Sequence, residues 1–251
     1  MYKSKIVALC AIVMSMSVHA NIEEKIVKSF SVDEKAELRL ENINGDVDIK
    51  GWDKNEIKVT AIITAKNQQA RDRITLEMKG NGRGVSIETE YKKESSGWGS
   101  NHAGSVDYTV MVPNHANLPS IDLVNGSMSI EGVKGEMKID LVNGSIIATG
   151  LTSNSEINSV NGKIIASYSS IGDDLNEISI DTVNGRIQLS LPDNISADVD
   201  IETMHGSIRN DFGLSANKNI FSGKNLQGTI GSGDVRISIE TVNGGVRLLK
   251  N

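Results

Sequence analysis

A short motif, Val-Asn-Gly, recurs along the chain and limits the folds that the chain can adopt. It occurs at five places, whose asparagines are Asn125, Asn143, Asn161, Asn184 and Asn243. The first three copies are 18 residues apart, and the fourth follows after 23 residues. A motif that repeats on a scale of about 20 residues is typical of architectures in which similar units stack on one another. The spacing therefore predicts a repeat fold.

Two variants extend the set of motifs. Ile43-Asn44-Gly45 is an earlier copy, and Met204-His205-Gly206, 21 residues after Asn184, carries histidine in the place of the asparagine. The repeat is therefore expected to begin well before the regularly spaced copies and to accept a histidine in place of the corner asparagine.

Apolar and polar residues alternate on both sides of each motif. Ile178 and Ile180 precede Asn184, and Ile187 and Leu189 follow it with the opposite parity. A period of two predicts half-buried strands. The change of parity indicates that the backbone turns at the Asn-Gly pair, where both residue types tolerate positive φ.

Two arrangements fit this pattern. In stacked β-hairpins, each Asn-Gly is the tip of a two-residue turn, and Ile180 would pair with Leu189. In a β-solenoid, each Asn-Gly is a corner, and coils of 18 to 23 residues stack around a shared core. The near-constant period favours the all-β solenoid. Its corner ladder would consist of Asn44, Asn125, Asn143, Asn161, Asn184, His205 and Asn243. We expect Asn143→Ala to cost about 1 kcal/mol, through one buried hydrogen bond and backbone strain.

Residues 1–20 have the pattern of a secretory signal peptide. Lys3 and Lys5 precede the apolar run IVALCAIVM, which is too short to span a bilayer as a helix. We expect cleavage after Ala20, no transmembrane segment after cleavage, and a periplasmic or secreted protein. The chain's one cysteine, Cys10, lies in this segment, so the mature chain would form no disulfide.

The rest of the chain divides into two expected regions. Residues 21–118 form an N-terminal β-strand region, packed as a layer on the first coils, and residues 119–251 form the β-repeat solenoid. Longer strands without the motif are predicted at 57–65, 74–78, 85–91 and 106–112. Residues 67–73 could form a turn or two of helix. The Gly- and Ser-rich segment 93–105, which contains Trp98, is predicted to be a loop.

The charge balance excludes one class of partner. Without Lys3 and Lys5 the chain has 24 basic and 32 acidic side chains, a net charge of −8. Nucleic-acid binding requires a stripe of Lys or Arg, which the sequence lacks. The three histidines of the mature chain have no metal-ligand spacing, and no phosphate-binding or nucleophile motif is found. We expect no cofactor, no metal and no catalytic residue.

Carboxylates occur shortly before the corners, at Asp122, Asp140, Asp181, Asp200, Glu202 and Glu240. Alternation puts them on the face opposite the neighbouring isoleucines, so the simplest interpretation is a solvated acidic stripe that also discourages edge pairing. Together with Trp98, they could also form a face that binds a sugar or a cation. Paired carboxylates in a groove would suit glycoside cleavage, although only 4% of the chain is aromatic, which argues against sugar-stacking platforms.

Several of these segments carry a resemblance to a known family. The signal peptide, the stretch ENINGDVDIKGWDKNEIKVTA, the VMVP before the repeats and the serial VNG copies resemble the exported adhesin-like β-strand-repeat proteins of bacteria. The resemblance covers nearly all of the mature chain and implies an exported, solenoid-like protein, with no catalytic residues to transfer from the family.

These observations favour a non-enzymatic envelope or surface protein that binds a partner or acts as a scaffold. Its partner would be a cell-envelope component, a polysaccharide or a protein. One alternative is a carbohydrate-active β-helix enzyme. Another is a structural element that self-associates through the open ends of its stack, because the last copy stops directly after its strand.

Overall fold

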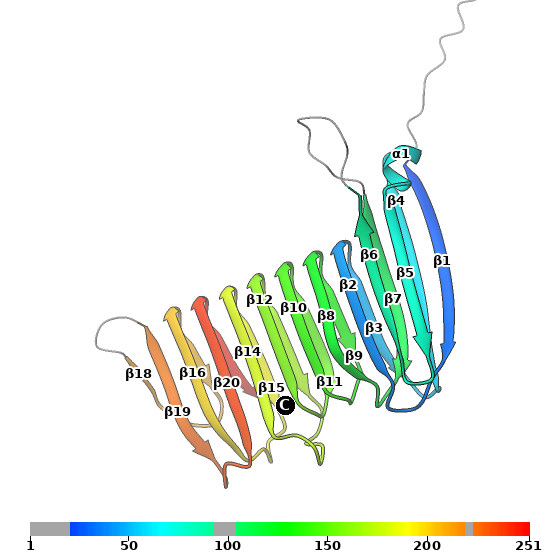
Figure 1. Cartoon of the computed structure of the whole chain (residues 1–251). Coiled ribbons are helices and arrows are strands. Elements are labelled where there is room, and N and C mark those ends of the chain that lie inside the picture. Colours follow the sequence, from blue (N-terminus) through cyan, green and yellow to red (C-terminus); the bar gives the residue numbers. More distant parts are fainter. Residues whose placement is uncertain (1–20, 93–103, 219–222) are drawn as a thin grey trace, which may run out of the picture.

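The chain folds into two large sheets that share one core (Figure 1). The computed structural model describes residues 21–92, 104–218 and 223–251. The predicted signal peptide and Trp98 lie outside these residues. The fold is all-β, with mixed sheets that do not close into a barrel, and it is solenoid-like in that similar strand pairs follow one another along the stack.

Each sheet contains strands from nearly the whole length of the chain. The ten-stranded sheet, named sheet A here, has the order β1 (Ile22–Ser31), β4 (Glu56–Ala65), β7 (Ser105–Pro113), β3 (Val47–Trp52), β9 (Met128–Glu131), β11 (Ile146–Leu151), β13 (Ile164–Tyr168), β15 (Ile187–Leu191), β21 (Val246–Lys250) and β17 (Ile208–Asn210). The eleven-stranded sheet B has the order β18 (Ala216–Lys218), β19 (Lys224–Ile230), β16 (Ala197–His205), β20 (Val235–Asn243), β14 (Glu177–Asn184), β12 (Ser155–Asn161), β10 (Met137–Asn143), β8 (Asn117–Asn125), β2 (Glu37–Asn44), β6 (Gly84–Tyr91) and β5 (Ile74–Asn81).

Alternation places one side of each strand in the core. In β10, Met137, Ile139 and Leu141 are buried, while Lys138 points to solvent. The buried side chains of both sheets form one continuous hydrophobic cluster. Because a single strand pair cannot bury its own inner face, the repeats must stack to exclude water from it.

Successive copies pair in parallel and in register. Asn143 is the register partner of both Asn125 and Asn161. Ile180 pairs with Ile157 on one side and Ile239 on the other, all within sheet B. The hairpin alternative is therefore wrong, because Leu189, the partner that it requires, lies in the other sheet.

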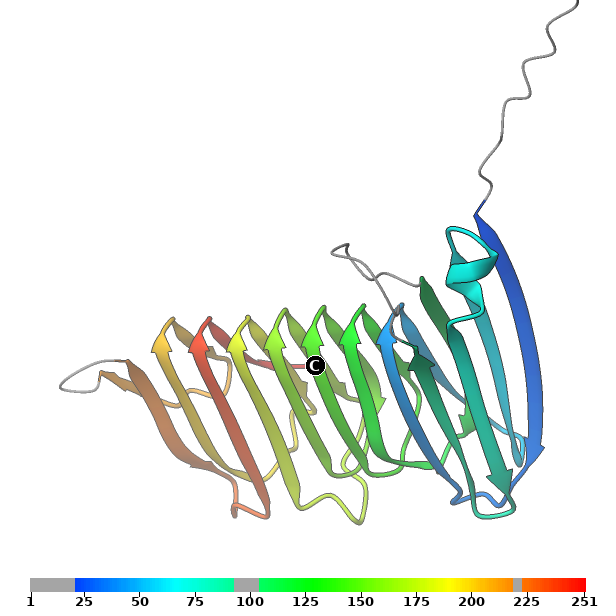
Figure 2. The same cartoon turned by 45° about the horizontal axis from the view of Figure 1, so that its top comes forward.

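The order of the strands in space differs from their order in the sequence. The last copy, β20 and β21, is inserted between β14 and β16 in sheet B and between β15 and β17 in sheet A. Figures 1 and 2 show the red strand β20 between the yellow β14 and the orange β16, with the C-terminus against the middle of the stack. The final copy therefore lies inside the stack and is covered by neighbouring strands on both sides.

The N-terminal strands extend the same two sheets. β2 pairs in parallel with β8, and β3 pairs in parallel with β9, so residues before 118 belong to the stack itself. The expected boundary between residues 118 and 119 falls inside β8, and strands from both sides of it share each sheet. Beyond β2 and β3, antiparallel pairs complete this end of the stack: β1 with β4, β4 with β7, and β5 with β6.

The one helix within the described ranges, α1 (Gln68–Arg71), is a single turn, as predicted. The Asn67 side chain caps it by accepting a hydrogen bond of 2.8 Å from the Ala70 amide. Within the described residues, no helix has the length and apolarity that a bilayer crossing requires.

Candidate functional site

The asparagines at the corners are joined by side-chain hydrogen bonds. Each Nδ2 donates to the Oδ1 of the copy before it in the stack, through five bonds of 2.8 to 3.1 Å. In stack order this ladder consists of Asn44, Asn125, Asn143, Asn161, Asn184 and Asn243. His205 takes the next place in register, and its carbonyl accepts from the Gly244 amide at 3.2 Å.

The backbone at these corners differs from the expectation in one respect. Among the described residues, positive φ is confined to glycines, so the corner asparagines do not adopt it. Gly144 has a φ of 147°, and a Cβ built on it would lie 1.8 Å from the carbonyl oxygen of Gly126. The glycine of each motif is therefore needed for the close approach of stacked backbones, and the asparagine is needed for its amide.

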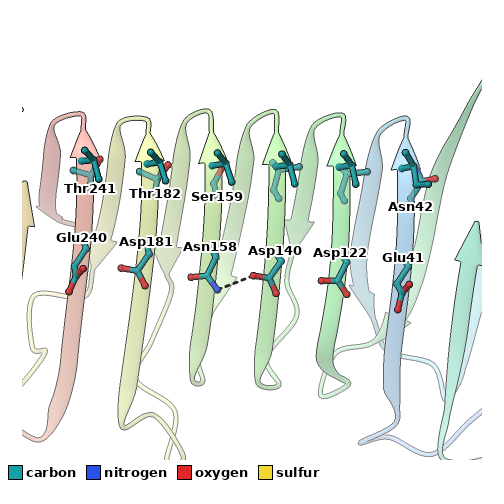
Figure 3. A pocket seen from close by; sticks show the side chains of 18 of the residues that line it. Glu41, Asn42, Asp122, Asp140, Asn158, Ser159, Asp181, Thr182, Glu240 and Thr241 are labelled. Carbon is teal, nitrogen blue, oxygen red and sulfur yellow. Dashed lines mark hydrogen bonds between the residues drawn. The ribbon is translucent and has the colours of Figure 1, made fainter. Parts of the chain in front are cut away.

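The outward face of sheet B carries an in-register row of carboxylates, named the acidic row here (Figure 3). In stack order it consists of Glu88, Glu41, Asp122, Asp140, Asn158, Asp181, Glu240 and Glu202. Because these residues are register partners, like charges stand directly opposite one another on strands about 4.8 Å apart. Asn158 interrupts the row and donates to Asp140 at 3.0 Å.

The structure brings together five of the six carboxylates that the sequence singled out. Asp200 lies elsewhere, because it is in register with Ser238 and accepts a hydrogen bond from Gln227. Sequence reasoning missed Glu41 and Glu88. Glu41 stands three residues before Asn44, as Asp140 does before Asn143, so the motif spacing could have found it. Glu88 precedes no corner motif, and only the pairing of β6 with β2 places it in the row.

A second row, missed at the sequence level, runs beside the acidic row. The residue before each corner is apolar yet exposed, from 36% of its surface at Val242 to 53% at Met204. This aliphatic row consists of Ile43, Val124, Val142, Val160, Val183, Val242 and Met204. The parity was visible in the sequence, since Val183 shares the outward parity of Asp181 and not the inward parity of Ile180. Contiguous exposed apolar surface of this kind marks interaction sites.

The two rows line one groove that crosses the repeats. It has a volume of about 1060 Å³, and the described residues that border it include eight carboxylates and two lysines. Lys92 follows β6 at one end and Lys224 begins β19 at the other, so the strands between them contribute only carboxylates among their charged lining residues. The groove is therefore apolar along one side and negative along the other.

Burial and hydrogen bonds shift the pKa of individual groups in and beside the groove. Desolvation raises the pKa of Asp181, which is half-buried in the groove, although hydrogen bonds from the Glu240 backbone and Ser179 oppose the shift. Just outside the groove, Lys138 donates to Glu156 at 2.6 Å. This hydrogen bond raises the pKa of Lys138 and, with one from Asn158, lowers that of Glu156.

The described residues contain no group of three or more His, Cys, Asp or Glu arranged to hold a metal ion. The carboxylates of the acidic row follow one another in a line, one to a strand, and do not converge on a point. His115 lies apart from the row, exposed and 3.9 Å from Glu34. Chemically, the site offers an extended surface for contact rather than a pocket around one atom.

The two stacked sheets, their asparagine corners and the outward groove together define an all-β repeat protein. The chain belongs to the Toastrack DUF4097 family, which matches residues 14–249. This match confirms the resemblance to exported adhesin-like repeat proteins that the motifs indicated. A comparison with curated protein sequences gives no match.

One solved structure shows the same fold at low identity. A candidate cell adhesion protein from Clostridium sporogenes ATCC 15579 is 15% identical, with a TM-score of 0.57 over 92% of this chain and 100% of the other. A candidate adhesin from Bacteroides fragilis NCTC 9343 is 10% identical, with a TM-score of 0.33 over 90% of this chain and 97% of the other. At 15% identity, the likeness to the Clostridium sporogenes protein concerns the fold alone.

Proposed function

We propose that this chain is an exported, non-enzymatic protein of the cell envelope that binds a partner through the groove of sheet B. The observation that carries the proposal is the aliphatic row, seven exposed apolar side chains in register on one face. Exposed apolar side chains that are scattered singly need no explanation, but a contiguous row of them is typical of a surface that another molecule covers.

Membership of the Toastrack family and the fold shared with a candidate cell adhesion protein support a surface role. The sequence pattern of residues 1–20 supports export, with cleavage after Ala20 and a periplasmic or secreted destination. We further infer that the stack is a solenoid of 18 to 23 residues per regular coil, with its asparagine ladder serving stability and the groove serving recognition.

Co-sedimentation tests this function. Residues 21–251 are mixed with isolated peptidoglycan, membrane vesicles and whole cells, and the bound fraction is measured against protein concentration. We expect saturable binding to one fraction, weakened in the double variant Val142→Ser/Val160→Ser. The matched control is Ile147→Ser, which removes a similarly exposed aliphatic side chain (41%) from sheet A. Absence of saturable binding, or equal loss in the control, would contradict the proposal.

Carbohydrate cleavage has one observation in its favour, since neighbouring carboxylates of the acidic row stand on strands about 4.8 Å apart, close to the separation of about 5–5.5 Å that retaining glycosidases use. However, the carboxylates extend in a line along the whole face, whereas that reaction needs one acid and one base on either side of a single bond. Release of reducing sugar ends from envelope polysaccharide, lost in Asp181→Asn, would favour the enzyme over the binding protein.

A further inference from the structure

The two rows of sheet B have a fixed geometry that limits what can lie against them. Members of one row are one strand apart, about 4.8 Å, and the two rows are two residues apart along each strand, about 6.7 Å. From β2 to β16, with both included, there are seven strands and six steps, which span about 29 Å. The complementary ligand is therefore long and narrow, apolar along one edge and positively charged along the other.

An α-helix lying across the strands meets these dimensions. Its turns repeat every 5.4 Å, so against a step of about 4.8 Å the mismatch over six steps stays below one turn. A helix is about 10–12 Å wide with its side chains, so two stripes about a quarter turn apart are separated by about 7–8 Å. About 20 residues at 1.5 Å each cover the length of the groove.

The charges of the groove determine which charge the side chains of that helix must carry. In the part of the lining that the structure describes there are eight carboxylates and two lysines, and both lysines lie at the ends. A second copy of this chain is a poor occupant, because it is acidic overall and would bring the same row of carboxylates. A polysaccharide would need aromatic platforms, and among the residues that the structure describes Tyr91 is the one aromatic side chain in the lining of the groove.

Resting on the proposed binding role, we propose that the groove of sheet B binds a cationic amphipathic helix of about 20 residues, laid along the stack axis. Its apolar stripe contacts the aliphatic row, and its Lys or Arg stripe, with residues three and four apart, pairs with the acidic row. Half-buried carboxylates such as Asp181 strengthen this pairing, because charges interact more strongly where water is partly excluded.

The test uses three synthetic peptides of 20 residues and the protein of residues 21–251. The first peptide has a leucine stripe beside a lysine stripe, the second has the same composition in scrambled order, and the third has glutamate in place of lysine. Binding is followed by fluorescence anisotropy of a labelled peptide. Helix formation is followed by circular dichroism at 222 nm, where an added helix stands out against an all-β protein.

We expect saturable binding and a gain in helix signal with the first peptide only, weakened by added salt. The double variant Asp122→Asn/Asp140→Asn should weaken binding about 10-fold, since each exposed ion pair accounts for a factor of about 1.5 to 5. Asparagine already occupies the equivalent position at Asn158, so the variant is expected to fold. Asp48→Asn, an exposed carboxylate of sheet A, is the matched control and should leave binding unchanged.

Three results would overturn the proposal: equal binding of the scrambled peptide, binding without a gain in helix signal, or equal effects of the groove variant and its control. The envelope assay separates this failure from that of the proposed function. If the groove variants lose envelope binding while the peptides do not bind, the binding role stands and the class of partner is wrong. If both assays are negative, the binding role itself fails.

Discussion

At the scale of single residues, the valine, asparagine and glycine of each corner motif have different roles. The asparagine amide donates to one neighbouring copy and accepts from the other, which a primary amide can do with one planar group. Gly144 lets the backbone approach Gly126 more closely than any Cβ would allow. Val142 reaches outward into the groove. The motif is therefore partly structural and partly exposed for contact.

Asn143→Ala tests the ladder. The change removes a bond of 2.9 Å to Asn125 and another of 2.9 Å from Asn161. Because Asn143 is exposed and has no positive φ, the expected loss is about 0.5–1 kcal/mol, without the strain that the sequence implied. Urea unfolding measures it. His205→Ala, at an exposed position in register beyond Asn243, should change stability by less, and an equal loss in both variants would contradict a role for the ladder.

Gly144→Ala should cost more than any asparagine change, at least about 3 kcal/mol, because the backbone of Gly126 blocks the new methyl group. Thermal unfolding or loss of soluble protein reports the effect. Gly82→Ala is the control: Gly82 lies in the β5–β6 turn with nothing within 4 Å of an added Cβ. If Gly144→Ala melts at the same temperature as Gly82→Ala, the close approach of the corners is wrong.

At the scale of strands, the outward face of sheet B combines two features that ordinary surface strands avoid. Like charges stand opposite one another, which weakens strand pairing, and apolar side chains stand exposed beside them. The inner faces follow the usual rule and bury Ile, Leu and Val. The stability of the stack therefore comes from the inner face and the backbone, while the opposed like charges of the outer face lower it.

Asp181→Asn tests this cost. Burial raises the pKa of Asp181, so the folded state disfavours the ionised form. This penalty is fully present above the raised pKa, shrinks as the pH falls below it, and is gone below the ordinary pKa of an aspartate, where the carboxyl is neutral in both the folded and the unfolded state. We expect the variant to be more stable by about 0.5 kcal/mol at pH 7, with the gain shrinking in acid. Thermal unfolding across pH measures it, with Asp48→Asn as the control, and a gain that persists in acid would point to another cause.

At the scale of the whole molecule, the insertion of the last copy ties the chain's end into the middle of the stack. Asn243 donates to Asn184 at 2.8 Å, and the backbone amide of Asn251 donates to the carbonyl of Leu191 at 2.9 Å. With His205 beyond Asn243, all six asparagines stay adjacent in one ladder. An imidazole carries its donor and acceptor at different ring positions, so placing His205 between Asn184 and Asn243 would interrupt the amide chain.

Deleting residues 232–251 tests this arrangement. The deletion removes β20 and β21, which lie between β14 and β16 and between β15 and β17. We expect β16 and β17 to lose hydrogen-exchange protection, because the strands with which they pair in parallel are gone, while β8, β10 and β12 keep theirs and serve as the internal control. If the copies instead stacked in sequence order, the deletion would only trim one end, and β16 and β17 would stay protected.

The sequence by itself determined the repeat, the all-β class, the corners and most of the acidic row, because periodicity and spacing record which side of a strand each residue faces. Asp140 and Asp181 could be assigned to one face from their neighbours alone. Only the tertiary structure decided that Glu88 belongs to that row, that Asp200 does not, and that Asn243 lies between Asn184 and His205. Pairing between distant strands depends on which exposed edges are available in three dimensions and on how their corners bond, and local alternation does not encode either.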